Sequence, residues 1–409
     1  MRQRYKNVTI KQSFFLKECH CLIKILIFAP KTIPILANYT LLYMDIQTAQ
    51  GSAISLLRTM ISIPSVSRDE QAVADMLQQY MTDATHQTVH RHNHNLWLID
   101  PHFDDRKPTL LLNAHIDTVK PAASWQHDPF LPTEETVVAE DGKFETRLYG
   151  LGSNDDGASL VSLLHVWMLL TEVPQTYNVI FLASAEEEVS GKNGIESVLP
   201  LLPKIDVALV GEPTGMHPAI AEKGLVVLDG VAHGKSGHAA RNEGVNALYI
   251  ALDAIQALRL YRFPEESETL GPVKVTTTGI QAGTTHNVIP DTCTFMIDVR
   301  TTDAYSNEQV VEMLREVVNN SSVTLTPRST RLQPSGIAAS HPLLQRIIAQ
   351  GRTPFGSPTL SDQALMRFPS VKMGPGQSSR SHTADEYIVI EEIYEAISLY
   401  WNILNGMNL

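Results

Sequence analysis

The stretch Val179-Ile180-Phe181-Leu182-Ala183-Ser184-Ala185-Glu186-Glu187-Glu188 joins an apolar run directly to three consecutive carboxylates. A continuous β-branched and aliphatic run is typical of a strand that is buried on both faces. Adjacent like charges repel and raise each other's pKa unless positive charge offsets them. Taken alone, the triplet is as compatible with a solvated turn as with a functional site, so the rest of the chain must decide.

Apolar runs that end in candidate ligands occur again elsewhere in the chain. Residues 109–117 end in His-Ile-Asp, and residues 206–212 end in a glutamate that precedes a proline. A glycine-rich turn over residues 150–157 carries Asp155 and precedes an expected helix over 158–170. Helical stretches between such runs indicate βαβ units and a mostly parallel sheet, in which ligands collect at the carboxyl ends of the strands. We therefore expect the acidic residues to form one site.

Length and composition limit the architecture and the partners. A chain of 409 residues is too long for one ordinary core, so two domains are expected. The formal charge of −12 argues against nucleic acid as the main partner, since phosphate binding needs a clustered basic surface. The three cysteines, Cys19, Cys21 and Cys293, are too few for a disulfide framework. We therefore expect a reducing, cytoplasmic environment.

Residues 1–43 differ from the remainder of the chain. Lys24, Lys31 and two prolines interrupt their apolar runs, so no window approaches the roughly 20 apolar residues of a membrane span. A secretory signal is disfavoured because Lys24 breaks the apolar core and no clear small-residue cleavage site follows. Met44 reads as a natural start. We interpret residues 1–43 as an extension outside the fold, and we expect no membrane association.

Beyond residues 223–224 the character of the sequence changes. The expected elements there are helices over 245–258 and 307–318 and strands over 273–280 and 292–300. This order is close to βαββαβ, and it provides enough chain for a small α+β domain of the ferredoxin-like kind. The overall fold class is therefore α/β, with a first domain from residues 44–222 and 332–409 that carries the acidic strand ends and an insert from residues 223–331.

Two other expected helices frame the first domain. One covers residues 49–60, and a closing helix covers residues 390–404. A helix that ends near Met81 follows the first, and Ser67 or Asp69 is its expected N-cap.

The residue types at the strand ends indicate a catalytic metal site. Imidazoles with carboxylates, and no cysteines, suit zinc, manganese or cobalt in such a site better than a structural zinc knot. A pair of metals needs a bridging carboxylate and terminal ligands on each side. The residues that supply this count are His115, Asp155, Glu188, Glu212 and His382. A remaining glutamate could take a proton from water.

This arrangement resembles the co-catalytic zinc aminoacylase/carboxypeptidase superfamily, which includes acetylornithine deacetylase and succinyl-diaminopimelate desuccinylase. The resemblance covers about Met44 to the C-terminus, with the motifs in family order. It implies that two divalent metals, most simply zinc, are bound. His115 and Glu212 would hold one metal, Glu188 and His382 would hold the other, and Asp155 would bridge them.

The resemblance also implies catalytic roles. Asp117 would orient His115. Glu187 would be the general base that activates water for attack on an amide carbonyl and then protonates the leaving amine. The sequence has Glu186 where the family usually has aspartate, which leaves the register of the triplet open by one residue. Asp156-Gly157 also stands where the family often has Met-Lys-Gly.

For the insert, the resemblance implies a lid and dimerisation domain. His238 would reach the active site of the partner subunit in a homodimer and stabilise the oxyanion. Asn287 and Arg300 match positions that bind the substrate carboxylate. Ser378 and Arg380 are candidate contacts to the acyl group or the side chain of the substrate, although a structural salt bridge explains Arg380 equally well.

Segments 359–366 and 374–382 are most similar to the acetylornithine deacetylase-like branch of arginine biosynthesis. The implied activity is deacetylation of N-acetyl-ornithine. N-acetyl-citrulline, N-succinyl-citrulline, N-succinyl-ornithine and succinyl-diaminopimelate remain alternative substrates. A non-catalytic binding protein on the same fold is a distant alternative. Residues 230–236 are a near miss to a nucleotide-binding loop, because they have three residues between the glycines where that motif needs four.

Overall fold

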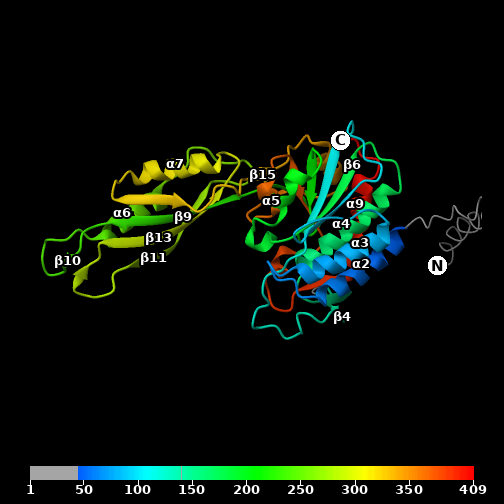
Figure 1. The fold of residues 1–409 in the computed structure, drawn as a ribbon, viewed down its shortest axis with the longest axis horizontal. Coiled ribbons are helices and arrows are strands. Elements are labelled where there is room, and N and C mark those ends of the chain that lie inside the picture. The colour runs from blue at the N-terminus through cyan, green and yellow to red at the C-terminus, as the bar shows by residue number, and fades with distance from the viewer. Residues whose placement is uncertain (1–44, 140) are drawn as a thin grey trace, which may run out of the picture. The chain divides into compact units, whose positions relative to one another are not determined.

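A computed structural model describes residues 45–139 and 141–409 of the chain (Figure 1). The expected extension over residues 1–43, with Cys19 and Cys21, lies outside the described residues. Within the described part, Cys293 is a buried free cysteine. No helix in this part of the chain has both the length and the apolar character that a bilayer crossing requires.

Four parallel strands form the centre of the larger sheet, in the order β6 (Asn178–Ser184), β3 (Thr109–His115), β7 (Val207–Val210) and β17 (Ser370–Lys372). Every residue of these strands is buried, as the continuous apolar runs predicted. The prediction of a mostly parallel central sheet is therefore confirmed.

Shorter strands extend this sheet to nine strands. On one side β2 pairs with β6 in the antiparallel sense and β1 follows, while on the other side β8 follows β17. The bounds are β1 (His90–His92), β2 (Asn95–Ile99), β8 (Ala219–Glu222), β15 (Ser335–Gly336) and β16 (Phe355–Ser357).

Helix α4 (Ala158–Thr171) packs against β3 and β6 on one side and against α2 (Ile46–Ile61) and α9 (Ile390–Leu404) on the other. Because α4 lies between two apolar layers, all of its residues from Ala158 to Leu170 are buried. The expected helices over 49–60, 158–170 and 390–404 are confirmed. The remaining short helices of this domain are α5 (Ile195–Val198) and α8 (Pro342–Ala349).

The prediction that Ser67 or Asp69 caps the helix after α2 was wrong. Helix α3 (Gln71–Thr85) begins after Glu70, which makes no side-chain cap hydrogen bond. The Ser67 hydroxyl, one of the two expected caps, instead donates to Asp117 Oδ2 at 2.7 Å. A local helix signal was therefore overridden by a contact that is distant in sequence.

A separate three-stranded antiparallel sheet holds β5 (Phe144–Tyr149) between β4 (Thr133–Val138) and β18 (Tyr387–Val389). Its pairing of Tyr387 with Tyr149 brings the segment around His382 beside the glycine-rich turn that follows β5. Two parts of the expected site, far apart in sequence, are joined in this way.

The insert contains the expected βαββαβ order and a four-stranded antiparallel sheet in the order β11-β13-β9-β14. Its elements are β9 (Gly224–His233), α6 (Ala247–Leu260), β11 (Lys274–Ala282), β13 (Thr292–Thr301), α7 (Asn307–Val318) and β14 (Val323–Pro327). A second hydrophobic cluster joins the two helices to this sheet. The ferredoxin-like insert is therefore confirmed as part of the fold class, while the exact domain boundaries stay a prediction.

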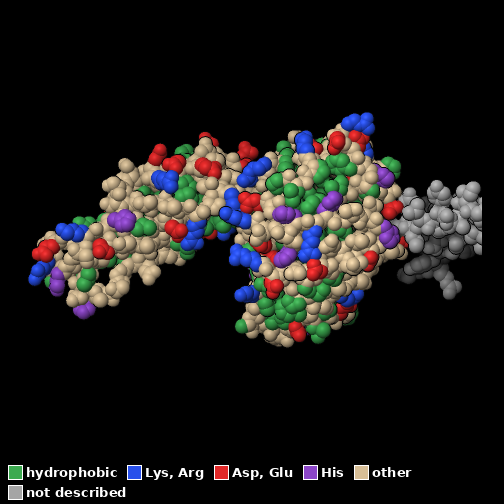
Figure 2. All heavy atoms as spheres, in the orientation of Figure 1, with side chains coloured by type: hydrophobic (Ala, Val, Ile, Leu, Met, Phe, Trp, Pro, Cys, Tyr) green, Lys and Arg blue, Asp and Glu red, His purple; other side chains and the backbone are tan. Residues whose placement is uncertain are grey.

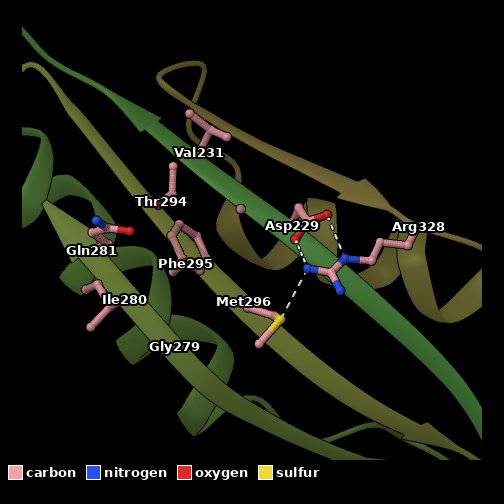
Figure 3. A pocket seen from close by; sticks show the side chains of 10 residues that line it. Asp229, Val231, Gly279, Ile280, Gln281, Thr294, Phe295, Met296 and Arg328 are labelled. Carbon is pink, nitrogen blue, oxygen red and sulfur yellow. Dashed lines mark hydrogen bonds and ion pairs between the residues drawn. The ribbon is translucent and has the colours of Figure 1, made fainter.

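Two features of the insert bear on where a site can be. A short ladder pairs β10 (Gly237–His238) with β12 (Val288–Ile289). A hollow of about 460 Å³ lies over β9, β11 and β13 (Figure 3). The Arg328 guanidinium in this hollow is already paired with Asp229 at 2.9 Å. The lining of the hollow contains no ionisable side chain besides Asp229 and Arg328, so the expected metal site does not lie here.

Candidate metal centre

The predicted metal ligands meet at the carboxyl edge of the parallel strands. His115 is the last residue of β3, the glutamate triplet follows β6, and Glu212 follows β7. His115 pairs with Ser184 in the β3–β6 ladder, so the triplet begins two residues beyond the level of His115. The parallel register thus brings these side chains together.

Two groups of candidate ligands share His115. Ligand atoms of His115, Asp155 and Glu188 lie within 4.8 Å of one another, and those of His115, Glu187 and Glu212 do so as well. His382 joins the first group, because its Nε2 atom is 2.9 Å from Glu188 Oε2. All five residues expected to bind metal are therefore gathered in one place.

Asp155 occupies the middle of this arrangement. Its Oδ1 atom is 3.2 Å from His115 Nε2, and its Oδ2 atom is 3.7 Å from His382 Nε2. One carboxylate oxygen thus faces each histidine, which is the placement that a bridging ligand needs.

The chemistry of the donor set fits divalent cations. It consists of imidazole nitrogens and carboxylate oxygens, with no sulfur; His115 and Asp155 are buried and the glutamates are half-buried. Burial raises the pKa of Glu187 well above its ordinary value, and the charges of Glu212 and Asp362 add to the effect. Burial likewise raises the pKa of Glu212, with the charge of Asp155 as the next cause. So many close carboxylates are costly unless cations offset their charge.

His115 is oriented by a contact on its far nitrogen. Its Nδ1 atom lies 2.8 Å from the main-chain carbonyl oxygen of Asp117 and 3.5 Å from the carboxylate of the same residue. A carbonyl oxygen only accepts hydrogen bonds, so Nδ1 carries a proton, and Nε2 is the nitrogen that faces Asp155 and could bind a metal. The main chain of Asp117 therefore provides the closer orienting contact.

The Asp117 carboxylate holds the triplet instead. Its Oδ1 atom accepts a hydrogen bond from the main-chain N–H of Glu187 at 3.0 Å, and Oδ2 accepts one from Glu188 at 3.2 Å. Asp117 is buried, so these charge-assisted hydrogen bonds are shielded from water. They fix the backbone on which the expected base and an expected ligand stand.

Glu186 points away from this cluster. Its carboxylate accepts hydrogen bonds from the Asn193 side chain at 2.9 Å and from the Asn193 main chain at 3.4 Å. Its backbone is in the left-handed region, with φ of 55°. The three glutamates of the triplet therefore differ in surroundings, and only Glu187 and Glu188 face the other candidate ligands.

Three buried carboxylates near the centre were not given a role from the sequence. Glu386 accepts hydrogen bonds from the main-chain N–H groups of Gly152, Asn154 and Asp155 at 2.9 to 3.1 Å. Burial raises the pKa of Glu386 to about 8. Glu386 therefore holds the turn that presents Asp155, and nothing in the local sequence pattern indicates this contact.

Asp156 and Asp362 are the other two. Neither carboxylate oxygen of Asp156 has a hydrogen-bond partner among the described residues, and burial raises the pKa of this residue to about 8. Asp362 lies 2.5 Å from the Ser184 hydroxyl at the end of β6, and burial raises its pKa to about 6. The sequence does point to Asp362, because this residue lies in segment 359–366, which resembles the acetylornithine deacetylase-like branch.

The expected residues of the insert are not part of this cluster. His238 lies in the β10–β12 ladder, and the main-chain N–H of Ala239 donates to the carbonyl oxygen of Asn287 at 3.0 Å. Arg300, on β13, forms a salt bridge with Asp298 at 2.9 Å. Within a single chain, the structure therefore groups none of these three with the candidate metal ligands.

Ser378 and Arg380 lie in a short 3₁₀ turn before His382. The Arg380 guanidinium forms a salt bridge with Glu392 at 2.6 Å and stacks over the Tyr387 ring at 4.5 Å. Of the two alternatives for Arg380, the structure displays the salt bridge. A substrate contact by Ser378 stays a prediction.

Comparisons with known proteins agree with this geometry. A family model described as a peptidase dimerisation domain matches residues 220–324, and a model of peptidase family M28 matches residues 100–210. The first match covers most of the insert, and the second covers β3, the glycine-rich turn and the triplet.

Curated relatives align over most of the chain. A putative succinyl-diaminopimelate desuccinylase from Mycobacterium tuberculosis is 27% identical over 373 residues, which is 87% of this chain and 99% of that protein. An acetylornithine deacetylase from Pectobacterium carotovorum is 26% identical over 301 residues, covering 69% of this chain and 76% of that protein.

Solved structures share the fold. A dinuclear metal-binding peptidase of family M20 from Bacillus subtilis superposes with a TM-score of 0.65 at 18% identity, covering 88% of this chain and 98% of that one. The aminopeptidase PepT from Bacillus cereus gives a TM-score of 0.68 at 18% identity, with coverage of 87% and 98%. These solved structures show the same fold. Together with the strand-end cluster of histidines and carboxylates, the family models and the curated relatives show a metal-dependent amidohydrolase of the aminoacylase/carboxypeptidase superfamily.

Proposed function

We propose that the protein is a two-zinc deacylase of N-acyl amino acids, with N-acetyl-ornithine as the preferred substrate and arginine biosynthesis as the setting. The observation that carries this proposal is the position of Asp155, with one oxygen toward His115 and the other toward His382. A carboxylate in that position supports a dinuclear centre, and the relatives support an acylated amino acid as substrate.

In the proposed centre, His115 and Glu212 hold one cation, Glu188 and His382 hold the other, and Asp155 contacts both. When bound, two divalent cations supply Lewis-acid activation of the amide carbonyl and of water. The 2.9 Å approach of His382 to Glu188 supports the choice of Glu188 as the ligand in the triplet.

Glu187 performs the proton transfers in this proposal. It accepts a proton from the attacking water and later donates it to the nitrogen of the leaving amine. Its side chain is 13% exposed and its Oε2 atom is 3.9 Å from His115 Nε2. The raised pKa of Glu187, caused mainly by burial, supports a carboxyl group that can hold a proton between the two steps.

His238, Asn287 and Arg300 complete the proposed site from the insert. The separation of His238 from the metal ligands within one chain supports its delivery to the active site of a partner subunit in a homodimer. There it would stabilise the oxyanion, while Arg300 and Asn287 would bind the substrate carboxylate. We also propose a cytoplasmic location.

Succinyl-diaminopimelate is the second candidate substrate. The desuccinylase relative aligns over 99% of its own length, more than the acetylornithine deacetylase relative does. N-acetyl-citrulline, N-succinyl-citrulline and N-succinyl-ornithine are further candidates, because the same amide chemistry would cleave them.

A substrate panel tests the proposal. The protein is stripped with a chelator, reloaded with zinc, cobalt or manganese, and assayed for release of free amino acid from these five acyl amino acids. We expect no turnover without metal and the highest kcat/KM with zinc and N-acetyl-ornithine. Highest kcat/KM with succinyl-diaminopimelate would replace the proposed substrate, and turnover that survives full metal removal would overturn the proposed chemistry.

A further inference from the structure

A pocket of about 320 Å³ in the insert gathers positive charge. It is formed by the end of α6, the residues that follow this helix, and the start of β11. Its charged lining consists of four cations and one acid, namely Lys223, Arg259, Arg262, Lys274 and Glu266. The chain as a whole has a formal charge of −12, so this concentration of cations runs against the composition.

The cations lack partners of opposite charge. Within residues 45–139 and 141–409, none of the four forms a salt bridge with a carboxylate. Other arginines of the insert do form them, since Arg300, Arg315 and Arg328 each contact an acid at 2.7 to 2.9 Å. The four cations of the pocket differ in this respect from those three arginines.

Neutral contacts hold two of these cations in place. The Lys223 ammonium donates to the Pro272 carbonyl oxygen at 3.1 Å. The Arg262 guanidinium donates through Nη1 to the carbonyl oxygens of Arg259 and Tyr261 at 3.1 and 2.8 Å, which caps the end of α6. These hydrogen bonds position the groups in advance but leave their charges uncompensated.

Two of these cations repel each other. Burial lowers the pKa of Lys223, and the nearby charge of Lys274 lowers it further. A bound anion would relieve this repulsion.

The pocket is larger than a single inorganic ion requires. Its volume corresponds to roughly ten water molecules in the liquid. Tyr261 and Phe263 contribute an aromatic wall, with their ring centroids 4.9 Å apart in an edge-to-face arrangement. This wall provides a surface for a flat or apolar group next to the cations.

We propose that this pocket is a binding site for a small phosphate-bearing metabolite, separate from the metal centre. The planar guanidinium groups of Arg259 and Arg262 suit the geometry of phosphate oxygens, and Lys223 and Lys274 add point charges. On the face drawn in Figure 2, Lys and Arg side chains gather near the junction of the insert with the larger sheet. Lys223 belongs to that junction, because it lies between β8 and β9 and its main-chain N–H donates to the Ser357 carbonyl oxygen in β16.

Calorimetric titration of the metal-loaded full chain tests the proposal. Inorganic phosphate and adenosine monophosphate are the probes, at an ionic strength held constant with sodium chloride. The test variant is R259Q/R262Q, which changes no residue of the proposed catalytic or substrate site. The control is R106Q/K143Q, which removes the same charge from side chains that are 89% and 83% exposed elsewhere on the chain.

We expect both probes to bind the wild type and the control, and the test variant to bind at least tenfold more weakly. Tighter binding of the nucleotide would identify an organic phosphate as the ligand, whereas equal affinities would identify free phosphate. Unchanged metal content, turnover and thermal unfolding of the test variant would exclude a folding defect.

Three outcomes would overturn the proposal. The first is that neither probe binds saturably above the chloride background. The second is equal binding by the wild type and the test variant, which would place phosphate at the metals. The third combines two results: the wild type binds no phosphate, and the test variant has a different oligomeric mass from the wild type. This would show that a second copy of the chain supplies the counter-charge.

Discussion

The substitution Glu187→Gln isolates the proposed proton transfers from metal binding. Glutamine keeps the size of the side chain but cannot accept and return a proton. The main-chain N–H of Glu187 is held by the Asp117 carboxylate at 3.0 Å, and this contact does not depend on the substituted side chain. Glu187 is also outside the proposed ligand set. The variant should therefore fold and bind both metals.

The expected loss of activity follows from the position of the carboxylate. General acid–base catalysis by a positioned side chain contributes about 10²–10⁴-fold to a rate. Since tenfold in rate corresponds to about 1.4 kcal/mol, the barrier should rise by about 2.7–5.5 kcal/mol. The loss should appear in kcat more than in KM, because the proton moves only in the chemical step.

The neighbouring Glu186→Gln is the matched control. It makes the same chemical change one residue away, on a carboxylate that contacts Asn193 and not the centre. Turnover of zinc-loaded enzyme and metal content by mass spectrometry are measured for both variants. Normal kcat in Glu187→Gln, or a large loss in Glu186→Gln instead, would show that the triplet has been assigned in the wrong register.

Three further predictions follow from buried or paired charges. Asp117→Asn should weaken metal binding by about 10–100-fold. The side-chain nitrogen of asparagine cannot accept a hydrogen bond, so one of the two main-chain N–H groups that the carboxylate now binds would lose its acceptor. Metal titration of the stripped protein checks this. Lys372→Met should lower the free energy of unfolding, measured by urea unfolding, by about 3–5 kcal/mol, because it leaves the charge of the fully buried Glu222 unpaired. Adding Glu222→Gln to the same chain should recover part of that loss. His127→Gln should lower stability by up to about 1 kcal/mol near pH 5.5 and hardly at all at pH 9. The hydrogen bond with Asp385 raises the pKa of His127, and hydrogen bonds from His127 lower the pKa of Asp385. The pair therefore stabilises the fold at pH values above the ordinary aspartate pKa and below the raised histidine pKa. Urea unfolding at the two pH values checks this.

The parallel sheet and most of the metal centre could be predicted from the sequence because both depend on local patterns. A buried parallel strand is a continuous apolar run, and the residue after it stands at the edge where ligands collect. His115 and Glu212 could be placed in this way once their strands were recognised. The pairing of β3 with β6 and β7 then brings their ends together without further information.

The supporting contacts could not be predicted, because they join distant segments through main-chain groups that have no sequence signature. Glu386 binds three N–H groups of a turn more than 200 residues earlier in the chain. Ser67 looked like a helix cap, but its hydroxyl is used by Asp117, 50 residues away. Local propensity cannot report such competition, since the stronger partner is created only by folding.

The same contacts explain how so many carboxylates can lie near one centre. Asp117 and Glu386 are buried, and each binds main-chain N–H groups of the segments that carry the candidate ligands. Hydrogen bonds from His115, Ser67 and the main chain outweigh the burial of Asp117 and lower its pKa, which is how this buried carboxylate is stabilised without a cation of its own. Glu187, Glu212 and Glu386 are different, because burial and neighbouring acids raise their pKa values. The metal ions are then needed to offset the charge at the centre itself, so metal binding and the stability of this edge of the sheet should be coupled.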